Sequence, residues 1–210
     1  TDLAITYLLA KGRPYEEEEA TMVRRFLAPG TNVIEFGGCM GIVSALVRKT
    51  IGPEARHIII EANPDLLPIL SRNAAGDALS GRTEIINAAV DYSGAKSVTF
   101  AFGPNAHMGY IAGAEAPGVT VPVVRLADLA RKLPDGPYAL ICDIEGAELA
   151  LFAAEKDQLT RINLIVLETH PRAYRNGKAD LEAMLQTIRG SGMELVQTDE
   201  DVVCFRRSHG

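Results

Sequence analysis

Short, continuous apolar runs alternate along this chain with longer segments whose apolar residues recur at helical spacing. A continuous apolar run is typical of a strand that is buried on both faces of a parallel sheet. The segments between the runs show the i, i+3, i+4 pattern of amphipathic helices. The runs occupy residues 33–35, 57–61, 84–90, 138–143 and 162–168. This alternation predicts a doubly wound, mostly parallel α/β sheet.

The C-terminal part of the chain breaks the alternation. Two further strands are predicted at residues 194–197 and 202–206, joined by the acidic turn Asp199-Glu200-Asp201. So short a connection makes them antiparallel. They bring the predicted sheet to seven strands.

A second break lies in the middle of the chain, at about residues 95–124. Val98, Phe100 and Phe102 alternate with polar or small residues, as do the valines of 119–123, which predicts a β pair. The intervening loop 103–118 is rich in Gly, Ala and Pro, and a loop of that length is usually functional. We therefore expect one domain over residues 1–210, with an N-terminal helical segment at about 1–28 and a β-pair insertion that acts as a lid.

Composition narrows the class of protein. A chain of 210 residues corresponds to one ordinary domain, and its net charge of −6 argues against nucleic acid as the natural partner. The three cysteines are an odd number, which favours thiols in a reducing compartment. No run of 18 apolar residues and no charged leader is present, so we expect no membrane partner and a cytoplasmic location.

A glycine-rich turn follows the first apolar run, in the segment Glu35-Phe36-Gly37-Gly38-Cys39-Met40-Gly41. A turn of this kind between a strand and a helix lets the backbone approach a ligand closely. Its glycine offsets match neither the dinucleotide fingerprint nor the phosphate-binding loop. An acid two residues before the first glycine would repel a pyrophosphate and favour a cationic ligand. S-adenosylmethionine, which carries an ammonium and a sulfonium, fits this requirement.

Four apolar runs end in a carboxylate, at Glu35, Glu61, Asp143 and Glu168. Ligands of open α/β sheets bind beyond the carboxyl ends of the strands, so we expect these acids to line one crevice. Glu61 follows the turn by about 20 residues, the position from which a carboxylate accepts both ribose hydroxyls.

Four segments of the chain together resemble the FkbM family of methyltransferases, class I enzymes that use S-adenosylmethionine. They are Glu35–Gly41, Ile60-Glu61-Ala62-Asn63-Pro64, Ile141–Glu148 and Ile165–His170, and the Asp-x-Glu-Gly-Ala-Glu element at 143–148 is the most specific. The chain has Glu35 where Asp is typical of the family, and Gly38-Cys39 where Ala-Asn is typical. The residues that we assign to cofactor binding are Glu35, Gly37, Gly38, Gly41, Glu61, Ala62, Asn87, Ala88 and Asp143.

The resemblance implies methyl transfer to oxygen, usually on a sugar or a polyketide-type natural product. A hydroxyl acceptor needs a base, and His170, just beyond run 162–168, has the right chemistry near neutral pH. His107 in the long loop is the second candidate. We assign Asp143 to the donor side and Glu145 to the acceptor hydroxyl. The predicted catalytic residues are therefore His170, Asp143 and Glu145.

Alternatives remain open at this point. Asp143, Glu168 and His170 could hold a divalent metal, but carboxylates facing a sulfonium explain the same residues, and we predict no metal ligands. A nicotinamide-dependent oxidoreductase and a non-catalytic cofactor-binding module are the rival functions. The expected partner is a small molecule with a hydroxyl group, and the oligomeric state is left open.

Overall fold

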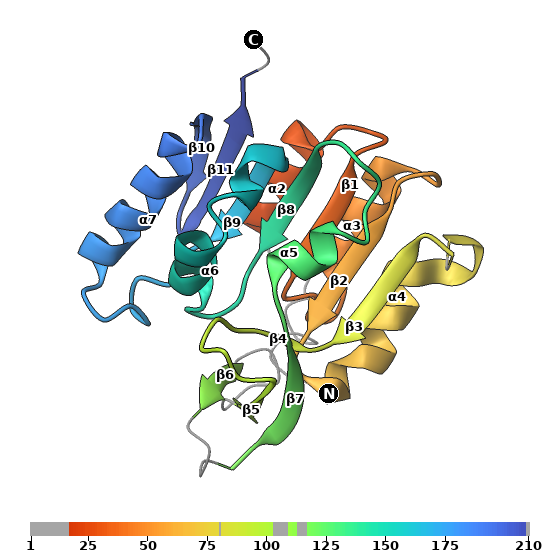
Figure 1. Ribbon diagram of the computed structural model, residues 1–210. Coiled ribbons are helices and arrows are strands. Elements are labelled where there is room, and N and C mark those ends of the chain that lie inside the picture. Colours follow the sequence, from red (N-terminus) through yellow and green to blue (C-terminus); the bar gives the residue numbers. More distant parts are fainter. Residues whose placement is uncertain (1–16, 80, 103–108, 113–116, 209–210) are drawn as a thin grey trace.

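The computed structural model describes residues 17–79, 81–102, 109–112 and 117–208. These residues form a seven-stranded sheet in the order β10-β11-β9-β8-β1-β2-β3 (Figure 1). Its strands are β1 (Asn32–Phe36), β2 (His57–Glu61), β3 (Thr83–Asn87), β8 (Tyr138–Cys142), β9 (Ile162–Glu168), β10 (Met193–Asp199) and β11 (Val202–Arg207). β11 pairs antiparallel with both β9 and β10, whereas β3, β2, β1, β8 and β9 pair in parallel. The predicted sheet and its antiparallel C-terminal pair are confirmed.

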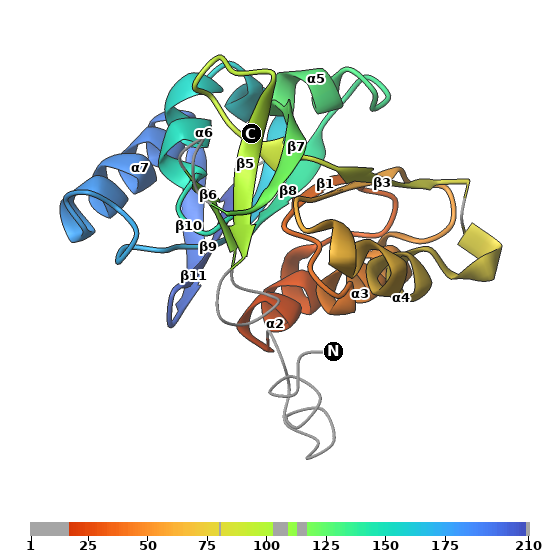
Figure 2. The ribbon, with the colours of Figure 1, turned by 90° about the horizontal axis from the view of Figure 1, so that it is seen from below.

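Helices cover both faces of this sheet, which makes it doubly wound (Figure 2). One face carries α2 (Glu17–Phe26), α3 (Ile42–Ile51) and α4 (Leu67–Leu79), the last preceded by the short helix η1 (Pro64–Leu66). The other carries α5 (Leu126–Ala130), α6 (Glu148–Ala154) and α7 (Lys178–Gly190), with η2 (Gln158–Arg161) between the last two. None of the helices formed by the described residues has the length and apolar character needed to span a membrane.

Strand residues alternate between these two layers, so the sheet separates two hydrophobic cores. Ile34 and Phe36 of β1 pack with α5, α6 and α7, whereas Val33 packs with α2 and α3. All three side chains are fully buried. Burial on both faces is the reason that the strands appear in the sequence as continuous apolar runs.

A smaller sheet lies beside the carboxyl edge of the large one, and its strand order is β4-β7-β5-β6 (Figure 1). It consists of β4 (Ala89–Val90), β5 (Ser97–Phe102), β6 (Gly109–Ala112) and β7 (Val119–Val124). The antiparallel pairing of β5 with β7, which sets Val98 opposite Val121, confirms the predicted β pair.

Two sequence expectations are wrong in this region. Residues 103–118 are not one loop, because β6 lies within them and pairs antiparallel with β5. The single strand expected at 84–90 is divided: β3 ends at Asn87, and β4 joins the smaller sheet by pairing with β7. His107 lies outside the described residues, and so do residues 1–16 of the predicted N-terminal helical segment. That the insertion at about 95–124 acts as a lid stays a prediction.

Candidate functional site

The carboxyl ends of β1, β2, β8 and β9 meet at one edge of the large sheet, because the four strands are parallel neighbours. Glu61 ends β2, Glu168 ends β9, and Asp143 directly follows β8. The backbone N–H of Asp143 donates to the carbonyl of Phe36 at 2.9 Å, which joins this acid to the start of the glycine-rich turn. Three of the four strand-end acids therefore lie at this edge of the large sheet.

The glycine-rich turn is packed between β2 and the end of β8. The N–H groups of Gly37 and Gly38 both donate to the carbonyl of Ile60, at 2.9 and 3.1 Å. A Cβ on Gly37, whose φ is +87°, would stand 1.8 Å from the carbonyl oxygen of Asp143. Only a residue without a side chain lets the turn and Asp143 approach this closely.

Glu61 faces the turn from the end of β2. Its two carboxylate oxygens accept the N–H groups of Cys39 at 2.8 Å and Asn63 at 2.6 Å. Burial raises the pKa of Glu61, and the hydrogen bonds from the backbone of Asn63 and Cys39 oppose that shift. The carboxylate is therefore held in a fixed orientation by main-chain donors.

Asn87, Ala62 and Ala88 surround the backbone of Glu61. The side-chain amide of Asn87 donates to the carbonyls of Glu61 and Ala62, at 2.8 and 3.0 Å, and Ala88 N–H donates to the carbonyl of Glu61 at 3.1 Å. The structure thus brings together four of the residues that the sequence assigned to cofactor binding. Their contacts with the cofactor stay a prediction.

Glu35 differs from the expectation that it lines the crevice. Its carboxylate is buried, accepts the Ser44 hydroxyl at 2.5 Å and lies 2.7 Å from Nε2 of His57. These contacts tie β1 to the first turns of α3 and to β2. They support a positioning role beneath the turn, and the assignment of Glu35 to cofactor binding stays a prediction.

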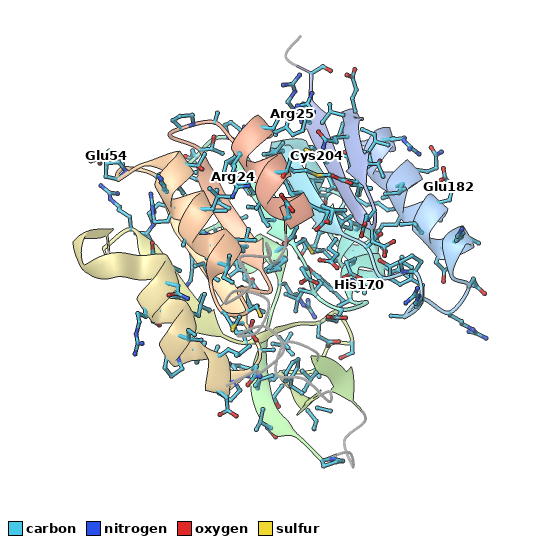
Figure 3. All side chains as sticks on the ribbon, turned by 180° about the vertical axis from the view of Figure 1, so that it is seen from behind. Arg24, Arg25, Glu54, His170, Glu182 and Cys204 are labelled. Atoms are coloured by element: carbon cyan, nitrogen blue, oxygen red, sulfur yellow. The ribbon has the colours of Figure 1, made fainter. Side chains whose placement is uncertain are left out.

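His170 stands beyond β9, at the edge of the large sheet that faces the smaller sheet (Figure 3). Its Nδ1 lies 2.8 Å from Oε1 of Glu148. Its Nε2 faces three carboxylates, 3.4 Å from Asp143 Oδ1, 3.6 Å from Glu145 Oε2 and 3.8 Å from Glu168 Oε1. The predicted catalytic residues His170, Asp143 and Glu145 are therefore together in space. We call His170, Asp143, Glu145, Glu148 and Glu168 together the His170 cluster.

Glu148 and Tyr174 hold the imidazole, and both were missed as site residues. Glu148 is fully buried and accepts the backbone N–H groups of Gly146 at 3.1 Å and Ile144 at 3.4 Å. The Tyr174 hydroxyl donates to Glu148 at 3.2 Å and accepts the N–H of His170 at 3.0 Å. Glu148 was part of the most specific motif, which was the available signal. Tyr174 had none, because it lies in an irregular segment after β9.

Among the described residues, one group of ligand atoms is close enough to share a metal ion. It consists of one atom each from Asp143, Glu145 and His170, all within 4.8 Å of one another. The set considered from the sequence had Glu168 in place of Glu145. The backbone of Glu145 has a φ of +53°, and this conformation brings its side chain to His170.

The charge of the His170 cluster follows from its neighbours. Burial alone would lower the pKa of His170, but the hydrogen bond and the charge of Glu148, with the charges of Asp143 and Glu145, outweigh burial and raise it to about 9. Burial also raises the pKa of Glu168, and the charge of His170 opposes that shift. The imidazole is therefore protonated at neutral pH when no ligand compensates the carboxylates.

This ion pairing predicts a pH dependence of stability. A pKa raised from 6.5 to about 9 on folding stabilises the native state fully below pH 6.5, and this contribution is lost as the pH rises through about 9. Measured with a chelator present, the free energy of unfolding should fall by about 1–3 kcal/mol across that window. His170→Gln should lack this fall. An equal fall in both proteins would contradict the prediction.

The architecture is that of S-adenosylmethionine-dependent methyltransferases. The chain is similar to a TehB-like enzyme of this class from Corynebacterium glutamicum, with a TM-score of 0.54, 10% identity, and coverage of 98% of this chain and 95% of that one. It is also similar to magnesium protoporphyrin IX methyltransferase from Synechocystis with bound S-adenosylmethionine, with a TM-score of 0.51, 14% identity, and coverage of 92% and 77%. At these identities the likeness shows the fold alone.

The family is shown by the sequence. The model of the methyltransferase FkbM domain matches residues 31–195, and the chain belongs to this family. No curated protein sequence matches the chain at a significant level. The cofactor is S-adenosylmethionine, in keeping with the family and with similar structures that hold it. Family membership decides against the nicotinamide-dependent alternative.

The residues at the edge fit this cofactor. Gly37 has no side chain, so the glycine-rich turn packs directly against the backbone of Asp143 at this edge. The Glu61 carboxylate accepts one N–H on each oxygen, and a carboxylate has about four lone-pair sites, so it can also accept hydroxyl groups. When bound, S-adenosylmethionine supplies an electrophilic methyl group.

Proposed function

We propose that this protein methylates a hydroxyl oxygen of a small molecule, such as a sugar or a polyketide-type product. The observation that carries the proposal is the His170 cluster, whose member Asp143 is joined by its backbone to the start of the glycine-rich turn. Carboxylates and imidazole accept hydrogen bonds from hydroxyl groups and can take up the proton that a hydroxyl loses.

The places of the residues support the roles proposed for them. Glu61 is the proposed ribose ligand, and Asp143, whose backbone contacts the turn, is proposed for the donor side. Glu145 is proposed to bind the acceptor hydroxyl, and His170 to take its proton in the neutral form, which requires a cation such as the bound cofactor to offset the carboxylates that raise the pKa of the imidazole. Glu148, through its bond to His170 Nδ1, is a positioning residue. Holding the reactants in line supplies much of the acceleration of a displacement at carbon.

The direct test is product analysis. Purified protein is incubated with S-adenosylmethionine and a panel of hydroxylated sugars and polyketide-type compounds, and each product is examined by mass spectrometry. A gain of one methyl group, located on oxygen by fragmentation, is the expected result. Methylation confined to nitrogen or carbon would overturn the proposed acceptor class. Cofactor binding without turnover on any acceptor would favour the non-catalytic module.

A thermal-shift measurement tests the cofactor contacts. S-adenosylmethionine at 100 times its Kd should stabilise the protein by about 2.7 kcal/mol, and NAD should not. Glu61→Ala should abolish most of that stabilisation, because it removes the proposed ribose ligand. Glu54→Ala is the matched control, since this carboxylate is exposed and lies before the amino end of β2. A full shift retained in Glu61→Ala would show that Glu61 does not bind the cofactor.

A further inference from the structure

The imidazole of His170 is held with one nitrogen toward the core and the other toward a group of oxygens. Nδ1 bonds the fully buried Glu148, and Tyr174 bonds the same carboxylate from the other side. Nε2 is thereby directed at Asp143 and Glu145. A carboxylate that bonds one nitrogen of a histidine, while the other nitrogen binds a metal, is the usual support of metal-ligating histidines.

Negative charge exceeds positive charge around this ring. Four carboxylates, those of Asp143, Glu145, Glu148 and Glu168, lie within 3.8 Å of its nitrogens. One imidazole balances at most one of them, even when it is protonated. The cluster therefore has the charge of a site for an added cation.

The spacing of the donor atoms also suits one ion. Two ligands of a common metal, each bound at about 2.1 Å, lie roughly 3.0–3.4 Å apart at tetrahedral or octahedral angles. Nε2 of His170 is 3.4 Å from Asp143 Oδ1 and 3.6 Å from Glu145 Oε2. All three ligand atoms lie within 4.8 Å of one another, and the side chain of Glu145, whose exposed fraction is 38%, has room to move toward the other two.

We propose that Asp143, Glu145 and His170 bind a divalent cation of the manganese or zinc type, with Glu168 beside them. Imidazole suits zinc and other transition metals, and carboxylates also suit manganese, whereas calcium and magnesium favour all-oxygen sites. This inference rests on the proposed function in one respect. A cation at this place would lower the pKa of a coordinated acceptor hydroxyl and so ease the loss of its proton.

The test is direct binding of Mn²⁺ to the full chain after removal of metals with a chelator, in the absence of cofactor and acceptor. The electron paramagnetic resonance signal of free Mn²⁺ reports binding by its loss. We expect one site per chain and competition by Zn²⁺. Asp143→Asn and Glu145→Gln should each weaken binding at least tenfold. Both substitutions keep the size of the side chain, and circular dichroism verifies that the variants are folded.

Glu194→Gln is the matched control. This exposed acid lies opposite Arg206 of β11, at the other end of the large sheet, and its loss should leave the Mn²⁺ affinity unchanged. Equal binding by the native protein, Asp143→Asn and Glu145→Gln would overturn the site. So would the absence of saturable Mn²⁺ binding in the native protein.

Activity measurements separate this inference from the proposed function. Methyl transfer at full rate in a chelator, without saturable Mn²⁺ binding, would overturn the metal site and leave the methyltransferase assignment intact. Saturable Mn²⁺ binding that depends on Asp143 and Glu145, without product from any hydroxyl acceptor, would support the metal site and count against the proposed acceptor.

Discussion

Replacing His170 by alanine is expected to lower kcat by about 10²–10⁴, with the affinity for S-adenosylmethionine changed little. The imidazole is the part of the cluster that faces Asp143, Glu145 and Glu168 at once. Whether it takes the acceptor proton itself or binds a cation that eases the loss of that proton, the proposed acceptor side of the site loses its central group. Steady-state kinetics that follow the formation of the methylated product measure kcat, and isothermal titration with the cofactor measures its affinity.

His170→Gln is the companion variant, because alanine removes the imidazole that bonds the buried Glu148 and could unfold the loop. The glutamine amide can still donate to Glu148, so the fold is kept while the imidazole is lost. Tyr174→Phe is the milder control, since it removes one bond to Glu148 and one from the His170 N–H but keeps the imidazole. A near-normal kcat in both His170 variants would show that His170 does not act on the acceptor.

The second large effect is expected at Gly37. An alanine there would place its Cβ 1.8 Å from the carbonyl oxygen of Asp143, and backbone atoms on both sides leave no flexible group to give way. The positive φ adds a cost of about 1–2 kcal/mol for a residue with a side chain. Together with the clash, we expect Gly37→Ala to lose about 3–5 kcal/mol of unfolding free energy. Chemical denaturation measures this loss, and cofactor affinity should fall with it.

Gly94→Ala separates the two contributions. Gly94 has a φ of +91°, close to that of Gly37, but a Cβ there would meet nothing within 4 Å. Gly94→Ala should therefore lower the free energy of unfolding only by the cost of the backbone conformation. Similar losses at Gly37 and Gly94 would show that the close approach of the turn to Asp143 is not a constraint on this fold.

Much of the site could be predicted, because its position depends on strand order and on residue type. Glu61 and Glu168 end strands that the apolar pattern already indicates, and Asp143 directly follows another; parallel strands bring their carboxyl ends to one edge. His170 follows the last of these strands closely. Its place near Asp143 was therefore expected, and the structure puts Nε2 and Oδ1 3.4 Å apart.

The partners of these residues could not be predicted in the same way. Ser44 and His57, which bond Glu35, and Tyr174, which bonds Glu148, are separated from them by 9 to 26 positions. Each pair depends on how a helix or loop packs against the sheet. No local periodicity carries that information, so Glu35 was expected in the crevice although its carboxylate is buried.

By itself, the sequence determined the large sheet, its helical layers and the edge where the acids gather, because hydrophobic period and turn residues act locally. Tertiary structure decided the rest. It divided the strand expected at 84–90, it added β6 to the smaller sheet through pairing with β5, and it placed the buried Glu148 against Nδ1 of His170. These outcomes depend on pairing and packing between distant segments, where burial of charge and hydrogen-bond satisfaction outweigh local preference.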